Sequence, residues 1–251
     1  MSVAGEGAFQ ADAVDELVTA NHILAFQGIL DAFGHISCRH PNRPDRFLMS
    51  RARAPALIAR DDIMEFELDG TPVDGQERRP YIERFIHAAI YARRPDVRSV
   101  VHDHSRCVIP FTVSSTPLRP ISNSGGPLGG AVPVWDVADK FGDCTNLLVV
   151  NMAMGEDLAE MLGQRPMMLM RGHGAVIAAP SIRWATFLSI GLDAEAKAVR
   201  EAMQLGDVKY LLPGEIEATG QIHADAGTDA LGRGWEYWCR QVGRPFSVNG
   251  Y

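Results

Sequence analysis

Short apolar runs and helix-length segments alternate along the whole chain, and this alternation limits the fold more than any other sequence feature. The runs 97–101, 167–170 and 175–179 are short and rich in apolar residues, as buried strands are. No internal repeat, low-complexity tract or linker interrupts the pattern. Because interspersed helices and strands pack in layers, the sequence predicts an α/β class and a single domain over residues 1–251.

Three helices can be placed from the residues at their ends. They are predicted from Asp12 to Phe33, from Pro80 to about Arg94, and from Ser181 to about Gly206. Asp12 and Ser181 are suitable N-caps, Pro80 suits a first helical position, and Gly34 can close the first helix. Further short strands are expected around residues 47–50 and 63–68.

The composition excludes two broad classes of partner. The net charge of −7 disfavours an electrostatic grip on nucleic acid or on an anionic membrane. No apolar stretch approaches the ~20 residues of a membrane span, and the N-terminus lacks the blocks of a signal peptide. The scattered cysteines form no CxxC pair, which is typical of reduced thiols. We therefore expect a cytoplasmic protein whose residues 1–10 are flexible.

Two histidines follow the run 97–101, in the sequence VVHDHS. Side chains alternate along a strand, so His102 and His104 are expected to point the same way. A metal site needs a third ligand, and His173 is the best candidate because flanking glycines permit a tight turn and a close approach. From spacing alone, a metal site and a chance arrangement with His173 as an ordinary turn residue are equally open.

An acidic residue near the second predicted helix adds to this group. Glu83 and His87 are spaced i and i+4, off the apolar stripe that includes Ile82 and Ile86. A carboxylate at this position can be a fourth metal ligand or a general acid/base. The alternative is a solvated helix face on which Glu83 pairs with a basic neighbour.

Taken in order, several motifs resemble the class II aldolase/adducin family over roughly residues 12–206. The matching pieces are FGHISCR (33–39), Glu83, VVHDHS (100–105) and RGHGAVI (171–177). The resemblance implies a three-layer α/β/α sandwich with a mixed central sheet. It also implies a divalent metal (manganese, zinc or cobalt, with iron as a further candidate) bound by His102, His104 and His173, with Glu83 as ligand or acid/base. Family members are usually tetramers, so residues 207–251 are expected to form a C-terminal extension at a subunit interface.

The departures from the family pattern concern the substrate. The sugar-phosphate enzymes of the family carry a Gly-Asn-x-Ser motif, where this chain has His35 in place of the asparagine. They also carry a Thr-Pro-Ser-Gly phosphate turn, where this chain reads LMSRARAPA over residues 48–56. A phosphate cradle needs free backbone N–H groups in such a turn, and no glycine is present here. Arg51 or Arg53 can instead bind a carboxylate through paired hydrogen bonds, and we favour Arg51.

These features resemble the aromatic decarboxylase branch of the family, which includes dihydroxyphthalate and hydroxypyridine-dicarboxylate decarboxylases. The resemblance implies a metal-dependent, non-oxidative decarboxylase of an ortho-hydroxy aromatic or heteroaromatic acid. We expect His35 or Ser37 to hold a ring substituent, and Glu83 or a nearby histidine such as His87 to handle the proton that replaces CO2. The branch implies a histidine within residues 120–130, where this chain offers Asn123 as its candidate for substrate binding.

Three other functions remain as alternatives. An aldolase acting on a non-phosphorylated keto acid needs the same metal and differs in the chemistry of its pocket. An iron-dependent oxygenase that decarboxylates oxidatively suits the three histidines nearly as well. A non-catalytic, adducin-like interaction module predicts no bound metal, and the intact ligand set argues against it.

Overall fold

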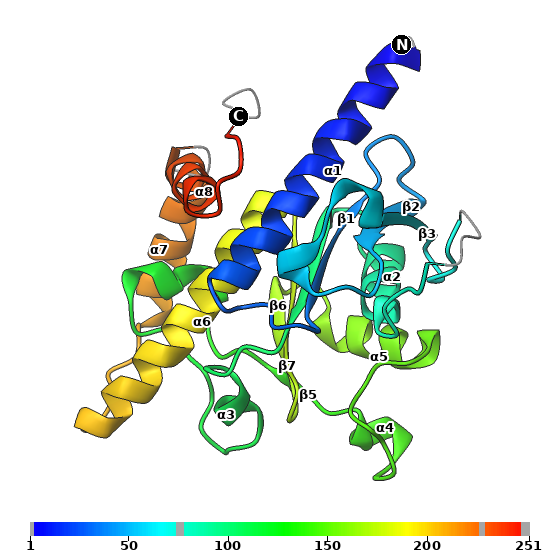
Figure 1. Ribbon diagram of the computed structural model, residues 1–251. Helices are drawn as coiled ribbons and strands as arrows, with labels where there is room; N and C mark the ends of the chain where they lie inside the picture. The colour runs from blue at the N-terminus through cyan, green and yellow to red at the C-terminus, as the bar shows by residue number, and fades with distance from the viewer. Residues whose placement is uncertain (1–2, 74–77, 226–228, 247–251) are drawn as a thin grey trace.

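The computed structural model describes residues 3–73, 78–225 and 229–246. A seven-stranded sheet lies at the centre, with helices on both faces (Figure 1). The strands are β1 (His35–Arg39), β2 (Arg46–Ser50), β3 (Ile63–Glu67), β4 (Ser99–Asp103), β5 (Val134–Trp135), β6 (Met167–Met170) and β7 (Gly174–Ala179). The helices are α1 (Val3–Phe26), α2 (Arg84–Arg93), α3 (Ile109–Thr112), α4 (Ala138–Phe141), α5 (Met152–Leu162), α6 (Ile182–Leu205), α7 (Pro213–Asp225) and α8 (Asp229–Gln241). Short 3-10 helices cover Pro55–Leu57 (η1), Arg60–Asp62 (η2) and Asn123–Leu128 (η3).

The strands lie in the order β3-β2-β1-β4-β7-β6-β5. Neighbouring strands are antiparallel except β5 and β6, which are parallel. The sheet is therefore mixed. Together with helices on both of its faces, this arrangement confirms the predicted α/β sandwich.

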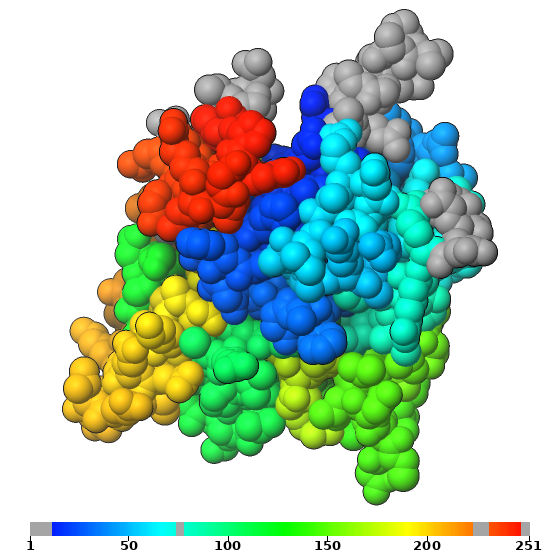
Figure 2. Space-filling view, viewed as in Figure 1, coloured from blue at the N-terminus to red at the C-terminus, as the bar shows by residue number. Residues whose placement is uncertain are grey.

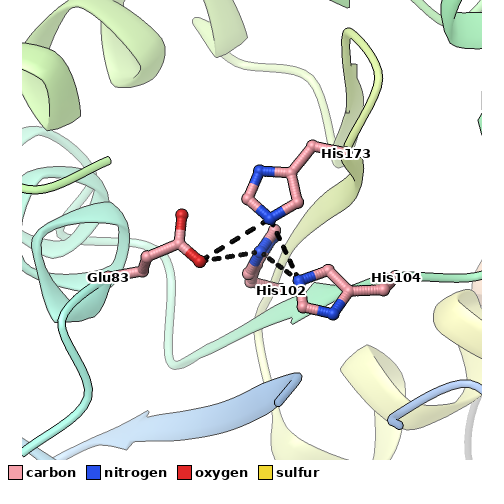
Figure 3. A group of neighbouring side chains, drawn as sticks. All are labelled: Glu83, His102, His104 and His173. Atoms are coloured by element: carbon pink, nitrogen blue, oxygen red, sulfur yellow. Dashed lines mark hydrogen bonds and ion pairs between the residues drawn. The ribbon is translucent and has the colours of Figure 1, made fainter. Parts of the chain in front are cut away.

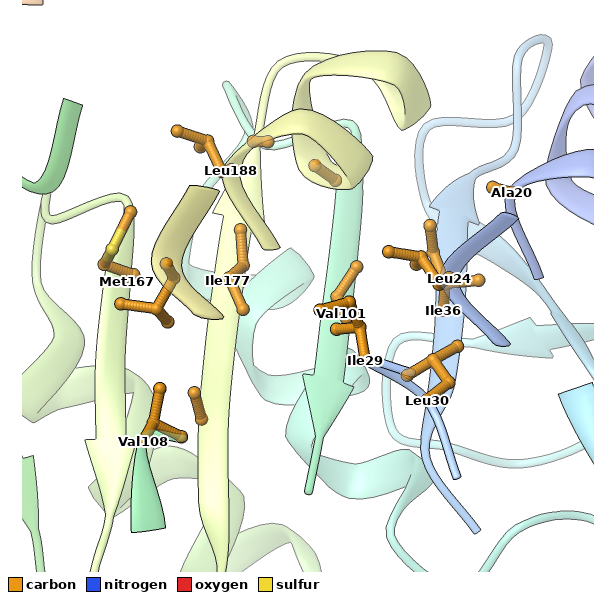
Figure 4. Packing of buried hydrophobic residues seen from close by; sticks show 14 of the residues in the cluster. Ala20, Leu24, Ile29, Leu30, Ile36, Val101, Val108, Met167, Ile177 and Leu188 are labelled. Carbon is orange, nitrogen blue, oxygen red and sulfur yellow. The ribbon is translucent and has the colours of Figure 1, made fainter. Parts of the chain in front are cut away.

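Alternating residues of the central strands enter two separate hydrophobic clusters, as the two-residue period of a strand requires. Val101 and Ile177 lie on the face covered by α1 and α6, where they pack with residues such as Leu24 (Figure 4). Val100 and Val176 lie on the opposite face, with apolar residues of α2 and α5. Because both faces of the sheet are buried, the sheet is the middle of three layers.

The first helix differs from the prediction at both ends. It begins at Val3 rather than Asp12, so the described part of the segment 1–10, predicted to be flexible, is helical. Gly28, with a φ of +74°, closes the helix instead of Gly34. The N–H groups of residues 28 and 29 donate to carbonyls of the last turn, in the pattern of a Schellman motif.

The second helix begins at Arg84, later than the predicted start at Pro80. An isolated antiparallel bridge joins Pro80 to Arg51, and this pairing holds the chain extended where the helix was expected. Glu83 consequently takes the N-cap position, with φ −88° and ψ 16°. The predicted helical i, i+4 relation between Glu83 and His87 is therefore wrong, because Glu83 lies before the first helical turn.

The C-terminal part of the chain packs on the same body. As predicted, Ser181 caps α6 by accepting a backbone N–H of the first turn, and the helix ends before Gly206. From α8, Trp235 and Cys239 enter the cluster under α1 and α6. Figure 2 shows this C-terminal segment, in red, beside the N-terminal helix, in blue. None of the helices in the described parts of the chain has the length and apolarity to cross a membrane.

The pairing of β4 with β7 brings two distant histidine segments together. His102 lies opposite Val176, and Asp103 lies opposite Ala175. At the end of this pairing the two backbones are so close that a Cβ atom on Gly174 would lie 1.9 Å from the carbonyl oxygen of Asp103. A residue with a side chain therefore cannot replace Gly174 without moving one strand.

We expect Gly174→Ala to lower the free energy of unfolding by about 2 kcal/mol or more, because the new methyl group must displace the end of β4. Gly191→Ala is the matched control: Gly191 lies inside α6, and an added Cβ meets nothing within 4 Å. This control should raise the free energy of unfolding by up to about 1 kcal/mol. Urea denaturation measures both changes, and equal stability of the two variants would contradict the close approach.

Candidate metal centre and its cavity

Four side chains from three parts of the fold converge at one point (Figure 3). His102 belongs to β4 and His104 follows that strand, while His173 precedes β7 and Glu83 precedes α2. One possible ligand atom from each residue lies within 4.8 Å of those of the others. The structure thus brings together all four residues that were suggested as metal ligands.

Each of the three histidines directs its Nδ1 atom at an oxygen acceptor. These acceptors are the carbonyl of Ala175 for His102, a carboxylate oxygen of Asp31 for His104 and the carbonyl of Leu147 for His173, at 3.1, 3.1 and 2.9 Å. A carbonyl or carboxylate oxygen only accepts, so each Nδ1 carries the hydrogen. Each Nε2 is left with a lone pair.

These Nε2 lone pairs face one another. The Nε2 atom of His104 lies 3.2 Å from that of His102 and 3.1 Å from that of His173. Acceptors at this separation repel one another unless a proton or a metal ion lies between them. Imidazole and carboxylate are suitable ligands for zinc, manganese, cobalt and iron. The donor set therefore fits a divalent transition metal, and the Nδ1 acceptors fix each imidazole ring in the orientation it needs.

Glu83 is held in the ionised state that a ligand requires. One carboxylate oxygen accepts the N–H of Val149 at 3.0 Å, and the other lies 3.5 Å from His102 Nε2 and 3.6 Å from His173 Nε2. Burial raises the pKa of Glu83, but His102, His173 and the Val149 N–H lower it by more, so that the net result is a pKa of about 2. Burial also lowers the pKa of His173, to about 4, which keeps that imidazole neutral and able to bind metal.

A cavity of about 610 Å³ opens beside Glu83 and His104, and its volume is that of a small-molecule site. Apolar groups make up much of its wall, and two arginines add positive charge. The other lining residues are Ala32, Phe33, His35, Ala52, Arg53, Ala54, Arg79, Pro80, Tyr81, Ile82 and Leu148. The cavity can therefore take a small, largely apolar molecule that carries anionic groups.

The two arginines of the wall are Arg53 and Arg79. Asp62, which is buried, binds Nη1 of Arg53 at 2.7 Å and Nε of Arg51 at 2.5 Å. Among the described residues, Arg53 lines the cavity and Arg51 does not. The placement favours Arg53 over Arg51, the residue preferred from the sequence, as a candidate for binding a carboxylate in the cavity.

His35 lines the cavity beside the metal group, with its ring centroid 5.2 Å from that of His102. Ser37 and His87 lie behind it and are fully buried. His87 Nε2 is 2.8 Å from His35 Nδ1, and Ser37 Oγ is 2.6 Å from His87 Nδ1. Neither residue is part of the cavity wall. The expected direct contact of Ser37 or His87 with a substrate is therefore not supported: His87 contacts His35, and Ser37 contacts His87.

Asn123 lies away from the cavity, exposed at the start of η3. The segment around it packs on α6 and α7. Buried Glu195 of α6 accepts the backbone N–H groups of Ile121 and Ser122 at 2.5 and 2.8 Å, which fixes this position. Asn123 therefore does not join the site of its own chain, contrary to the expectation from the sequence.

Three site residues were not found from the sequence. Asp31 holds His104, Arg79 lines the cavity, and Tyr81 lies with its ring centroid 4.6 Å from that of His35. Asp31 also accepts backbone N–H groups of the following turn, and this local role does have a sequence signal. Its contact with His104 has none, because the two residues meet only in the folded chain.

Three imidazoles and a carboxylate lie beside a ligand-sized cavity, on the sheet of an α/β sandwich, and this group could hold a metal ion. The family model described as the class II aldolase and adducin N-terminal domain matches residues 15–199. The chain belongs to this family, as its motifs predicted.

Curated relatives point to one branch of the family. The chain is 36% identical to decarboxylase tropJ of Talaromyces stipitatus, over 91% of this chain and 93% of that protein. It is 29% identical to the 3,4-dihydroxyphthalate decarboxylase of Arthrobacter keyseri, over 81% of this chain and 84% of that protein. These names confirm the predicted resemblance to the aromatic decarboxylase branch and support a carboxy-lyase.

Solved structures confirm the fold. L-fuculose 1-phosphate aldolase from Glaciozyma antarctica matches with a TM-score of 0.79 and 22% identity, over 98% of this chain and 96% of that chain. An aldolase II superfamily protein from Pseudomonas syringae matches with a TM-score of 0.78 and 22% identity, over 93% and 92% of the two chains.

We expect His102→Ala to lose most of the bound metal, because it removes one of the converging Nε2 atoms. His22→Ala is the control, since His22 Nε2 contacts the carbonyl oxygen of Ile58 outside the metal group. Metal content per chain, measured by plasma mass spectrometry after dialysis, checks the prediction. Equal metal in the two variants would contradict the assignment.

Proposed function

We propose that the chain is a divalent-metal-dependent, non-oxidative decarboxylase of an ortho-hydroxy aromatic or heteroaromatic acid. The observation that carries this proposal is the convergence of three imidazoles and the Glu83 carboxylate beside a ligand-sized cavity, whose wall includes Glu83 and His104. The decarboxylase names of the relatives support the choice of reaction. A cytoplasmic tetramer remains part of the proposal.

His102, His104, His173 and Glu83 would hold the metal. When bound, a divalent ion supplies Lewis-acid charge neutralisation for the substrate oxygens next to the carbon–carbon bond that breaks. The apolar wall excludes water from that bond and keeps the ring in one plane. Tyr81 and Ile82 belong to this wall. Positioning of this kind lowers the entropic part of the barrier.

The mouth of the cavity would hold the far end of the substrate. Arg53 is fixed by Asp62, and Arg79 has no side-chain partner among the described residues. Two guanidinium groups can bind a second carboxylate through charge-assisted hydrogen bonds. This fits an aromatic dicarboxylate, one carboxylate being lost as CO2 while the other stays at the arginines.

Glu83 would move the proton that the reaction needs. Its low pKa makes it a carboxylate at neutral pH, so it can accept the proton of the substrate hydroxyl. As CO2 leaves, its bonding electron pair remains on the ring, and Glu83 returns the proton to the ring carbon. The product hydroxyl then takes one proton from water, which balances the reaction.

The proposal predicts CO2 release in the absence of oxygen. Metal-loaded protein should decarboxylate at least one member of a panel of ortho-hydroxy aromatic dicarboxylates, and His102→Ala should abolish this activity. Headspace CO2 measured under argon is the readout. Activity that requires both iron and oxygen would contradict the non-oxidative reaction. Aldol cleavage of a keto acid, with no CO2 from the panel, would contradict decarboxylation.

Arginine variants test how the second carboxylate is bound. Arg53→Met should raise KM by about 10- to 100-fold, the effect of losing a hydrogen bond to a charged group of about 1.5–3 kcal/mol. Arg51→Met retains the wall residue and should change KM far less, although it removes one partner of Asp62. Steady-state kinetics of both variants show which arginine binds the carboxylate. A larger effect of Arg51→Met would favour Arg51, the residue preferred from the sequence.

A further inference from the structure

A row of four hydrogen-bonded side chains leads from the cavity wall into the interior. His35 Nδ1 lies 2.8 Å from His87 Nε2, Ser37 Oγ lies 2.6 Å from His87 Nδ1, and Ser37 Oγ lies 2.8 Å from Tyr91 Oη. All four residues are at most 1% exposed. The row joins β1 to α2 and lies beside the metal group without belonging to it.

Full burial disfavours a charge on any member of this row. Burial lowers the pKa of His87 to about 3. Burial raises the pKa of Tyr91 well above its ordinary value. Neither His35 nor His87 has a carboxylate as a hydrogen-bond partner in the row. Each bond is therefore a neutral one, with one donor and one acceptor.

The far end of the row fixes the direction of every bond. The recorded hydrogen-bond partner of Tyr91 Oη among the described residues is Ser37 Oγ. A buried phenol hydrogen without an acceptor is costly, so Tyr91 donates to Ser37. Val100 also forms a backbone hydrogen bond to Tyr91, and this bond lowers the pKa of the phenol. A bond donated to the phenol oxygen has this effect, so the oxygen accepts from Val100 while its hydrogen goes to Ser37.

The remaining hydrogens follow from this first one. Ser37 has one hydrogen and already accepts from Tyr91, so it donates to His87 Nδ1. His87 then carries its hydrogen on Nε2 and donates it to His35 Nδ1. Because His35 Nδ1 is an acceptor, the hydrogen of His35 is on Nε2. This Nε2 atom has no partner among the described residues, and His35 lines the cavity.

The geometry points to His35 as a fixed, neutral Nε2–H donor to the substrate, with Ser37, His87 and Tyr91 as the residues that set its tautomer. The acceptor rests on the proposed decarboxylation: it is the substrate hydroxyl oxygen, which becomes negatively charged when it gives up its proton. A neutral imidazole can stabilise such an oxygen without giving up its proton. His35 is therefore a hydrogen-bond donor rather than the source of the proton that replaces CO2, and His87 and Ser37 are positioning residues.

Nitrogen NMR tests the tautomer without any turnover. In zinc-loaded protein with ¹⁵N-labelled histidine, two-bond ¹H–¹⁵N correlations distinguish Nε2–H, Nδ1–H and imidazolium forms, and His35→Gln and His87→Gln assign the signals. We expect the Nε2–H form for both residues at neutral pH. An Nδ1–H form or an imidazolium at His35 overturns the inference. Neither result depends on whether the protein releases CO2.

Variants at the far end of the row test its positioning role. Tyr91→Phe keeps the ring but removes the terminal hydrogen, so His35 should become a mixture of tautomers. The kcat of the Tyr91→Phe variant should fall about 10- to 100-fold, with a smaller change in KM and unchanged metal content. Ser37→Ala should behave in the same way, and Ser37→Thr should restore the Nε2–H signal.

Tyr210→Phe is the matched control, because Tyr210 stacks on Arg119 away from the row. An unchanged His35 tautomer in Tyr91→Phe would overturn the role of the row. A loss of CO2 release in every protein, with the tautomers as expected, would instead refute the proposed reaction and leave the assignment of His35 intact.

Discussion

The convergence of three imidazole Nε2 atoms with the Glu83 carboxylate is the constraint on which the site depends. Such a group can bind a metal ion only if each ring is held in the right orientation from behind. The chain meets this need with acceptors from three different segments: the start of β7, the turn after α1 and the loop before α5. The antiparallel pairing of β4 with β7 and the absence of a side chain at Gly174 bring two of the three histidines within reach. The pairing of the strands therefore positions the residues that could hold a metal.

The sequence was informative wherever the decisive interaction was local. The spacing of His102 and His104, the glycines around His173 and the cap at Ser181 act over a few residues, and the structure places them as expected. It failed where a distant partner decided the outcome. The bridge of Pro80 to a strand end delays α2, and no local pattern contains that information. The choice between the two arginines likewise depends on Asp62, a single buried carboxylate that both of them share.

Charge is distributed unequally along the cavity, and this separates two tasks. At the mouth, Arg53 and Arg79 are partly solvated, so they can stay charged and attract an anionic group at little desolvation cost. Behind His35 the side chains are fully buried, and burial makes any ionisation there expensive. Under the proposed function, this difference orients a substrate with two acidic groups: the carboxylate that it keeps faces the arginines, and the carboxylate that it loses lies beside the residues that would hold the metal.

The row behind His35 is understandable as a consequence of one departure from the family motif. The resembling aldolases carry an asparagine where this chain has His35, and an amide offers N–H groups in a fixed position on one nitrogen. A neutral imidazole has a single hydrogen that can be on either nitrogen, so a histidine gives a reliable donor only if a second group chooses the tautomer. His87, Ser37 and Tyr91 make that choice through bonds of 2.6–2.8 Å. A histidine at this cavity position thus requires supporting polar residues in the interior. These residues must all be hydrogen-bonded, because an unsatisfied polar group is costly when it is buried.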